Sequence, residues 1–177
     1  KKFVGTYNPK HHLLDFNKPI TIGPLQLQDS YFETKIQQHE AMNNALRVFP
    51  KICSELTRVT RRKYGYFEKY KMADATSVIV TTSSTAGTTK AVVDKLRDEG
   101  KKVGLLKITL FRPFPYKDIA AELKGIKSIA VLDRAFSFGA NAPLFTAIKA
   151  AMSDMTIKPK MQSCVFGLGG RNISEEH

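Results

Sequence analysis

Four short loops carry the polar and charged side chains of this sequence that could do chemistry. They read TTSSTAGTTK (81–90), FRPFP (111–115), DRAFSFGANAP (133–143) and GLGGRN (167–172), and each follows an apolar run. Hydroxyls and glycines before a helix can bind an anion, and arginines beside a carboxylate can bind or move charge. The candidate residues are Ser83, Ser84, Thr85, Gly87, Thr88, Arg112, Asp133, Arg134 and Arg171.

The glycine-containing loops also have a structural interpretation, which we favour. Ser84 or Thr85 would cap a helix, because a hydroxyl oxygen accepts the free amides of a helix start, and Gly87 would relieve a tight turn. The first loop lacks the GxxxxGK[ST] order of a phosphate loop. The last lacks GxGxxG, since Asn172 stands where the third glycine would be.

The charged residues of the other two loops are likewise interpreted as ion-pair residues. Asp133 beside Arg134 could be an acid or base next to a cation, but such a pair is more often a satisfied interstrand or interface ion pair. Arg112 follows a strand and precedes Pro113, so it lies at a rim that faces partners. We expect an interdomain or intersubunit ion pair for Arg112, with small-anion binding as the alternative.

A self-contained catalytic or metal site is not expected. No Ser-His-Asp or Cys-His arrangement is present, the four histidines show no ligand spacing, and Cys53 and Cys164 form no CxxC. Structural zinc and iron–sulfur sites need several ligands at short spacing. We therefore expect no catalytic residue, metal or cofactor in this chain, and two reduced, buried cysteines typical of a cytoplasmic protein.

The net charge of +12 does not predict nucleic-acid binding. Residues 1–76 hold 13 Lys and Arg against 7 Asp and Glu, and residues 77–177 hold 15 against 9, so the excess is spread evenly. The only dense cluster is Arg58, Arg61, Arg62 and Lys63, without an RNA-recognition or helix-turn-helix signature. A solvated basic surface is the better interpretation. No run is long enough to cross a membrane.

Strands and helices alternate after residue 76, which predicts a doubly wound, mainly parallel α/β sheet in three layers. The expected strands are 77–80, 103–110, 128–133 and 161–166, and the expected helices are about 87–99, 115–124 and 142–152. The four loops follow the strands, so they meet at the carboxyl edge of the sheet, where ligands of such sheets bind.

Residues 1–76 are expected to form an arm and a helical connecting segment, separate from the α/β domain of 77–177. The arm, 1–28, is rich in proline yet too apolar for disorder. Ser30 and Glu33 form a capping-box pattern that predicts a helix start. Pro50 should kink or break this helix before a second helical segment at 51–60.

Several motifs together resemble the alpha subunit of 2-oxoacid:ferredoxin oxidoreductases, most closely the pyruvate type. RPFP, VLDR and GLGGR occur in that order, within MADATSVIVTTSSTAGTTKAVVDKLRDEGKKVGLLKITLFRPFP (72–115), IKSIAVLDRAFSFGANAPLF (126–145) and FGLGGRNI (166–173). The stretches YFETKIQQHEAMNNA (31–45) and RKYGYFEKYKMADA (62–75) also match. One departure is Ser83-Ser84, where the family usually has Gly-Ser. Serine adopts positive φ reluctantly, which favours the capping interpretation of this loop.

The resemblance implies a transketolase C-terminal-type domain of an enzyme that oxidatively decarboxylates a 2-oxoacid to acyl-CoA. It implies thiamine diphosphate, Mg and iron–sulfur clusters elsewhere in the complex, with ferredoxin and CoA as partners through that complex. It also implies a preceding pyrimidine-binding domain, and the start at Lys1 fits a piece cut just after it. We expect this segment to act in assembly and interdomain packing. The alternative is a small α/β module that binds an anion or a CoA-like nucleotide.

Overall fold

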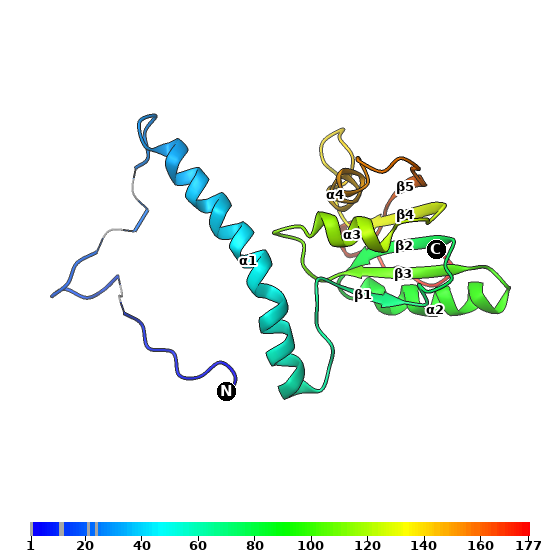
Figure 1. The fold of residues 1–177 in the computed structure, drawn as a ribbon, viewed down its shortest axis with the longest axis horizontal. Coiled ribbons are helices and arrows are strands. Elements are labelled where there is room, and N and C mark those ends of the chain that lie inside the picture. Colours follow the sequence, from blue (N-terminus) through cyan, green and yellow to red (C-terminus); the bar gives the residue numbers. More distant parts are fainter. Residues whose placement is uncertain (1, 11–12, 21, 24) are drawn as a thin grey trace. The chain divides into compact units, whose positions relative to one another are not determined.

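The computed structural model describes residues 2–10, 13–20, 22–23 and 25–177. The chain divides into two compact units, Lys1–Lys63 and Tyr64–His177 (Figure 1). The boundary therefore lies after Lys63 rather than after residue 76. Residues 64–76 join the α/β unit because a strand within them pairs with the sheet.

The first unit contains one long helix, α1 (Tyr31–Thr60), and its other described residues form neither helix nor strand. The expected break at Pro50 is wrong: one missing amide donor does not interrupt a helix of 30 residues. The expected capping box is also wrong, because the Ser30 hydroxyl donates to Gln26 Oε1 at 3.0 Å instead of capping α1. Arg61, with φ of 62°, ends the helix and donates its amide to the Thr57 carbonyl.

The second unit is built on a five-stranded sheet in the order β1-β3-β2-β4-β5. Its strands are β1 (Phe67–Tyr70), β2 (Ser77–Thr82), β3 (Val103–Ile108), β4 (Ser128–Asp133) and β5 (Lys160–Val165). The last four are parallel, as expected, and β1 pairs antiparallel with β3. Strand β1 was not predicted, because its four residues, FEKY, do not alternate between apolar and charged types.

Helices cover both faces of the sheet, so the three-layer α/β expectation is confirmed (Figure 1). One face packs against α3 (Tyr116–Glu122) and α4 (Pro143–Ala151), and the other against α2 (Thr85–Asp98). The larger core lies on the α3 and α4 face, where alternate residues of the central strands such as Val80 and Val131 are fully buried. Period-two alternation in the strands places this apolar set on one face.

The connections through α2, α3 and α4 carry the chain back across the sheet, so that each following strand starts at the same edge and runs parallel to the one before. Gly100 with φ of 79° and Gly125 with φ of 81° follow α2 and α3, in the left-handed conformation that glycine adopts without steric cost. The loops after β2, β3, β4 and β5 therefore share the carboxyl edge. Among the described residues, no helix has both the length and the apolar character that a bilayer crossing requires.

Candidate functional site

Asp133, the last residue of β4, is buried beneath the start of α4. Its Oδ1 accepts the amide of Leu144 at 2.9 Å, and its Oδ2 accepts the amide of Phe145 at 3.0 Å. A carboxylate at this position satisfies amides that have no partner within the helix and also complements the positive end of the helix dipole. Asp133 is thus a helix cap, and within the described residues it forms no ion pair with Arg134.

Arg134 is exposed and lies against Gly167, which follows β5. Its Nη2 donates to the Gly167 carbonyl at 3.0 Å, and its guanidinium carbon lies 5.9 Å from the centre of the Phe166 ring. A Cβ on Gly167 would lie 3.0 Å from Arg134 Nε, and Gly167 has φ of 61°. The glycine therefore allows both the turn and the close approach of the arginine, which ties the end of β4 to the end of β5.

The loop after β2 does not cap its helix as expected. The side chain of Ser84, at the N-cap position, makes no capping hydrogen bond to α2. Ser83 adopts φ of 57°, so this serine takes the left-handed conformation that glycine would take there. Thr85 is buried as the first residue of α2, and its carbonyl accepts the Thr89 hydroxyl at 2.9 Å.

A cavity of about 750 Å³ lies on the α2 face of the sheet and is partly closed by the C-terminal segment. It brings together three of the candidate residues, Thr85, Thr88 and Arg171, with apolar side chains such as Ile79 and Leu132. Cys164 also lines it and is only half-buried, so the expectation that both cysteines are buried holds for Cys53 alone.

Arg112 lies elsewhere, beside the α3 and α4 face. Its Nη1 donates to its neighbour's carbonyl, Phe111 O, at 2.7 Å, and its guanidinium stacks 4.1 Å from the Phe111 ring centre. It lines a groove of about 340 Å³ together with Tyr116 and Asn141. Phe114 is buried and Phe111 packs against the same core, as expected for the corner between β3 and α3.

The nine candidate residues therefore do not form one site. Thr85, Thr88 and Arg171 share the cavity on the α2 face, and Arg112 lines a groove on the opposite face. Asp133 and Arg134 fasten neighbouring elements. The other three, Ser83, Ser84 and Gly87, line none of the cavities described above.

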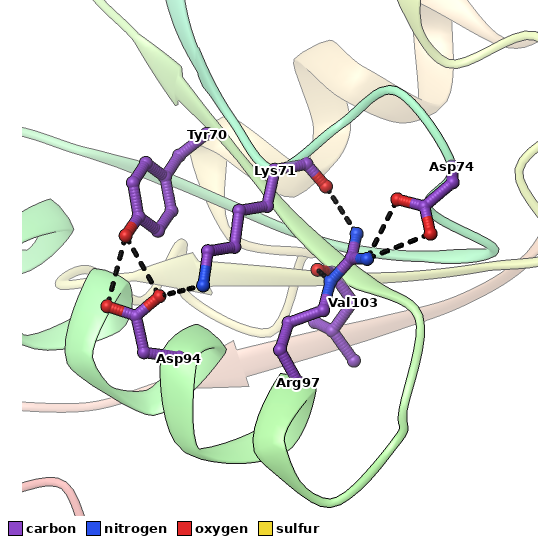
Figure 2. A network of polar contacts seen from close by, with 6 residues as sticks. All are labelled: Tyr70, Lys71, Asp74, Asp94, Arg97 and Val103. Atoms are coloured by element: carbon purple, nitrogen blue, oxygen red, sulfur yellow. Dashed lines mark hydrogen bonds and ion pairs between the residues drawn. The ribbon is translucent and has the colours of Figure 1, made fainter.

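A polar network that the sequence analysis missed joins β1 and the turn after it to α2 (Figure 2). Arg97 Nη1 donates to Asp74 at 2.7 and 3.0 Å, Arg97 Nη2 donates to the Lys71 carbonyl at 2.6 Å, and Nε donates to the Val103 carbonyl at 2.7 Å. Sequence spacing carries no signal for this arrangement, because Arg97 and its partners come from three separate segments: α2, the turn after β1, and β3. The guanidinium holds the edge of the sheet together.

Tyr70, Lys71 and Asp94 form the second half of this network. The Tyr70 hydroxyl donates to Asp94 at 2.9 and 3.0 Å, and Lys71 forms an ion pair with the same carboxylate. These hydrogen bonds from Lys71 and Tyr70 lower the pKa of Asp94. The bond to Asp94 raises the pKa of Tyr70, since the carboxylate stabilises the protonated phenol. The network is structural: it lies away from the carboxyl edge.

The donor groups of the described residues do not come together as a metal or iron–sulfur site. Among the described residues, no three His, Cys, Asp or Glu side chains lie close enough to hold a metal ion. Cys53 and Cys164 belong to different units. A cluster held by thiolates needs four ligands, which two cysteines do not supply.

Comparison with known proteins decides the family. The family model "Pyruvate:ferredoxin oxidoreductase core domain II" matches residues 75–177, more than half of the chain. The chain belongs to this family. Across its whole length it is 52% identical to the pyruvate synthase subunit PorA of Thermotoga maritima, and it covers 45% of that relative. The resemblance inferred from RPFP, VLDR and GLGGR is thereby confirmed.

Further relatives have related names. The chain is 42% identical to the pyruvate synthase subunit PorA of Methanocaldococcus jannaschii, with 98% of the chain and 44% of the relative covered. It is 36% identical to the ketoisovalerate oxidoreductase subunit VorA of Pyrococcus horikoshii, again over 98% of the chain and 44% of the relative. The chain thus spans about half the length of the curated relatives it matches.

A solved structure is also similar to part of the chain. It is a 2-oxoglutarate:ferredoxin oxidoreductase from Magnetococcus marinus with 2-oxoglutarate, coenzyme A and succinyl-CoA bound. The sequence identity is 22% and the TM-score is 0.48, with 76% of this chain and 22% of that chain covered.

The core domain II match begins at Ala75, so it contains the four parallel strands and leaves out β1.

Proposed function

We propose that this chain is a non-catalytic part of the alpha subunit of a pyruvate (2-oxoacid):ferredoxin oxidoreductase, where it acts in assembly and interdomain packing. The parent enzyme would oxidatively decarboxylate the 2-oxoacid to acyl-CoA with thiamine diphosphate, Mg and iron–sulfur clusters held by other domains or subunits. Ferredoxin and CoA would be partners of the complex. Two free cysteines fit a cytoplasmic location.

The observation that carries this proposal is the use of Asp133. It is a carboxylate at the end of β4 that could act as an acid or base, and both of its oxygens accept amides of α4. General acid–base catalysis needs a group that can reach a substrate proton. The identity of 52% over the whole chain to a pyruvate synthase subunit supplies the enzyme class.

The test combines the purified chain with the other oxidoreductase subunits of the same organism. We expect the tagged chain to co-purify with them in a fixed ratio. Reduction of ferredoxin that depends on pyruvate and CoA should require the assembled complex and be absent from the chain alone. Turnover by the isolated chain would contradict the proposal, as would failure to associate with any of these subunits.

The cavity of about 750 Å³ favours a second candidate function, the binding of a small anion or a CoA-like nucleotide. Thr85 and Thr88 at the start of α2 and Arg171 across the cavity could hold phosphate oxygens, and apolar side chains such as Phe166 could pack on a base. A thermal-shift screen with CoA, nucleotides and phosphate tests it. At ligand concentrations well above Kd, saturable stabilisation of about 2–4 kcal/mol is expected. If none of these ligands shifts the melting temperature, this candidate function is excluded.

A further inference from the structure

Two phenylalanines project from the loop between β4 and α4. Phe138 is fully exposed and Phe136 is 68% exposed. The loop tip is a turn in which the Ala140 amide donates to the Ser137 carbonyl at 2.9 Å. Within it, Phe138 has φ of 45° and Gly139 has φ of 88°. A positive φ is unfavourable for a bulky residue, so the turn holds an aromatic ring outward at a conformational cost.

Two arginines at this loop make no ion pair with the described acidic residues. Arg112 donates to the Phe111 carbonyl and lies over the Phe111 ring, and Arg134 contacts the Gly167 carbonyl and the Phe166 ring. Arg97, in contrast, has a carboxylate partner in Asp74. Within the described part of the chain, the ion pairs lie among β1, the turn after it, β3, α2, α3 and the segments flanking α2, with one more from Lys95 to Glu175 of the C-terminal segment. Arg112 and Arg134 thus keep their charge available to another molecule.

The arginine and the turn lie side by side. Arg112 lines the groove of about 340 Å³ together with Ser137, Ala140 and Asn141 of the same loop. Phe136 and Arg134 belong to this loop as well. We call Arg112, Arg134, Phe136 and Phe138 the strand-end surface. It combines two exposed aromatic rings with two cations. Arg112 lines the groove beside the turn that carries Phe138, whereas Phe136 lines the cavity on the α2 face.

We propose that the strand-end surface is the docking site for another subunit of the same oxidoreductase, one that offers an apolar pocket for Phe138 with carboxylates beside it for Arg112 and Arg134. This proposal rests on the proposed function and specifies its contact. Aromatic residues and arginine are enriched at protein interfaces and dominate their energetics. Arginines with no acid in their own chain gain most from acids in a partner, which gives the charge complementarity.

The preformed turn adds to this argument. An anchor that is already held in its bound conformation loses little conformational entropy on binding. The turn hydrogen bond and the two positive φ angles hold Phe138 in place before any partner arrives. A nucleic acid would instead call for a longer stripe of cations along the surface, and here two arginines are interleaved with two phenylalanines.

The test measures binding of the whole chain to each separately purified subunit of the same organism's oxidoreductase by biolayer interferometry. Phe138→Asn is the main variant, because asparagine tolerates positive φ and keeps the turn while the ring is lost. Arg112→Glu reverses a charge that makes no ion pair with any described residue. Ile157→Asn and Lys124→Glu are matched controls, since Ile157 is 85% exposed and both residues lie in connections at the opposite edge of the sheet.

We expect the Kd for one subunit to rise by about 30-fold in Phe138→Asn and by about tenfold in Arg112→Glu. The controls should stay within about twofold of the unchanged chain, and the melting temperature of each variant reports its folding. If both strand-end variants bind as tightly as the unchanged chain, the docking inference fails and the proposed function stands. If the unchanged chain binds none of the subunits, both fail. Stabilisation by inorganic pyrophosphate that is lost in Arg112→Glu would instead assign the surface to a small anion and overturn the proposal.

Discussion

The carboxylate of Asp133 accepts the Leu144 amide at 2.9 Å, so the last residue of β4 holds the first turn of α4. Asp133→Ala leaves two buried amides without their acceptor, and we expect the free energy of unfolding to fall by about 2–3 kcal/mol. Asp133→Asn should cost less, because its carbonyl oxygen still accepts one amide. Urea unfolding followed by circular dichroism measures both. A loss below about 0.5 kcal/mol in Asp133→Ala would contradict the capping role.

Gly104 of β3 passes so close to the turn after β1 that a side chain does not fit. A Cβ there would lie 2.9 Å from the Lys71 carbonyl and 2.9 Å from Met72 Sδ. We expect Gly104→Ala to lower the free energy of unfolding by about 1–3 kcal/mol through overpacking. Gly87→Ala is the control, because a Cβ at Gly87 meets nothing within 4 Å. It should be neutral or stabilising by about 0.5–1 kcal/mol in the same unfolding measurement.

Ser83 holds a conformation that glycine adopts more easily. With φ of 57° and an exposed side chain, it loses little when the side chain is removed. The left-handed conformation costs an L residue about 1–2 kcal/mol, and the greater freedom of unfolded glycine offsets about 0.5–1 kcal/mol of that. Ser83→Gly should therefore raise the melting temperature slightly, and Ser83→Val should lower it. Differential scanning calorimetry measures both melting temperatures. A lower melting temperature in Ser83→Gly than in the unchanged chain would contradict this prediction.

The acidic side chains around β1 make the stability of the α/β unit depend on pH. Hydrogen bonds from Lys90, Arg97 and Lys71 lower the pKa values of Glu68, Asp74 and Asp94 respectively. The unfolded chain binds protons near the ordinary values of 4.5 for Glu and 3.8 for Asp, whereas the folded chain binds them only at lower pH. Their contribution is complete above these values and is lost as pH falls through the folded pKa values.

Melting temperatures between pH 6 and pH 2.5 should therefore fall steeply at the acidic end of that range. Asp94→Asn should flatten the curve, because one of the depressed groups is gone. Tyr70 has the opposite sign: its raised pKa adds stability below the ordinary value of 10.0, which is lost as pH rises through the folded pKa. Tyr70→Phe should leave the acid limb largely in place and weaken the alkaline dependence. An acid limb that is unchanged in Asp94→Asn would contradict the network's role.

Local patterns predicted the parallel strands and their helices, because each is encoded within a few residues. The strand at 128–133 is observed with the expected bounds, and a helix follows β2 as expected, ending just before Gly100. Strand β1 was missed, since the charged pair Glu68 and Lys69 faces solvent at a sheet edge and only pairing with β3 defines it. The break predicted at Pro50 was wrong for a different reason. The helical turns on either side of Pro50 stabilise α1 more than the loss of one hydrogen-bond donor destabilises it.

The site residues were predicted by type but not by role. Asp133 and Arg134 are adjacent in sequence, yet one is buried under α4 and the other lies over Gly167, because successive residues at a strand end point to opposite sides. The hydrogen bonds of Arg97 to Asp74 and Lys71 could not be predicted from local patterns, because these partners lie 23 or more residues before Arg97 in the sequence. The exposed Phe138 could have been noticed in SFG, where a turn signal follows an aromatic residue.

The antiparallel pairing of β1 with β3 also sets an order of events during synthesis on the ribosome. Phe67 pairs with Ile108, so β1 leaves the exit tunnel well before its only partner strand exists. Until then, Tyr70 and its neighbours have no place in the sheet, and contacts this distant in sequence form slowly. The parallel strands can begin to assemble as β2, α2 and β3 emerge. Strand β1, although synthesised earlier, pairs with β3 only after that and forms the edge of the sheet. A nascent chain arrested before Ile108 should accordingly be cleaved by protease within residues 64–76, and a chain arrested after β4 should resist.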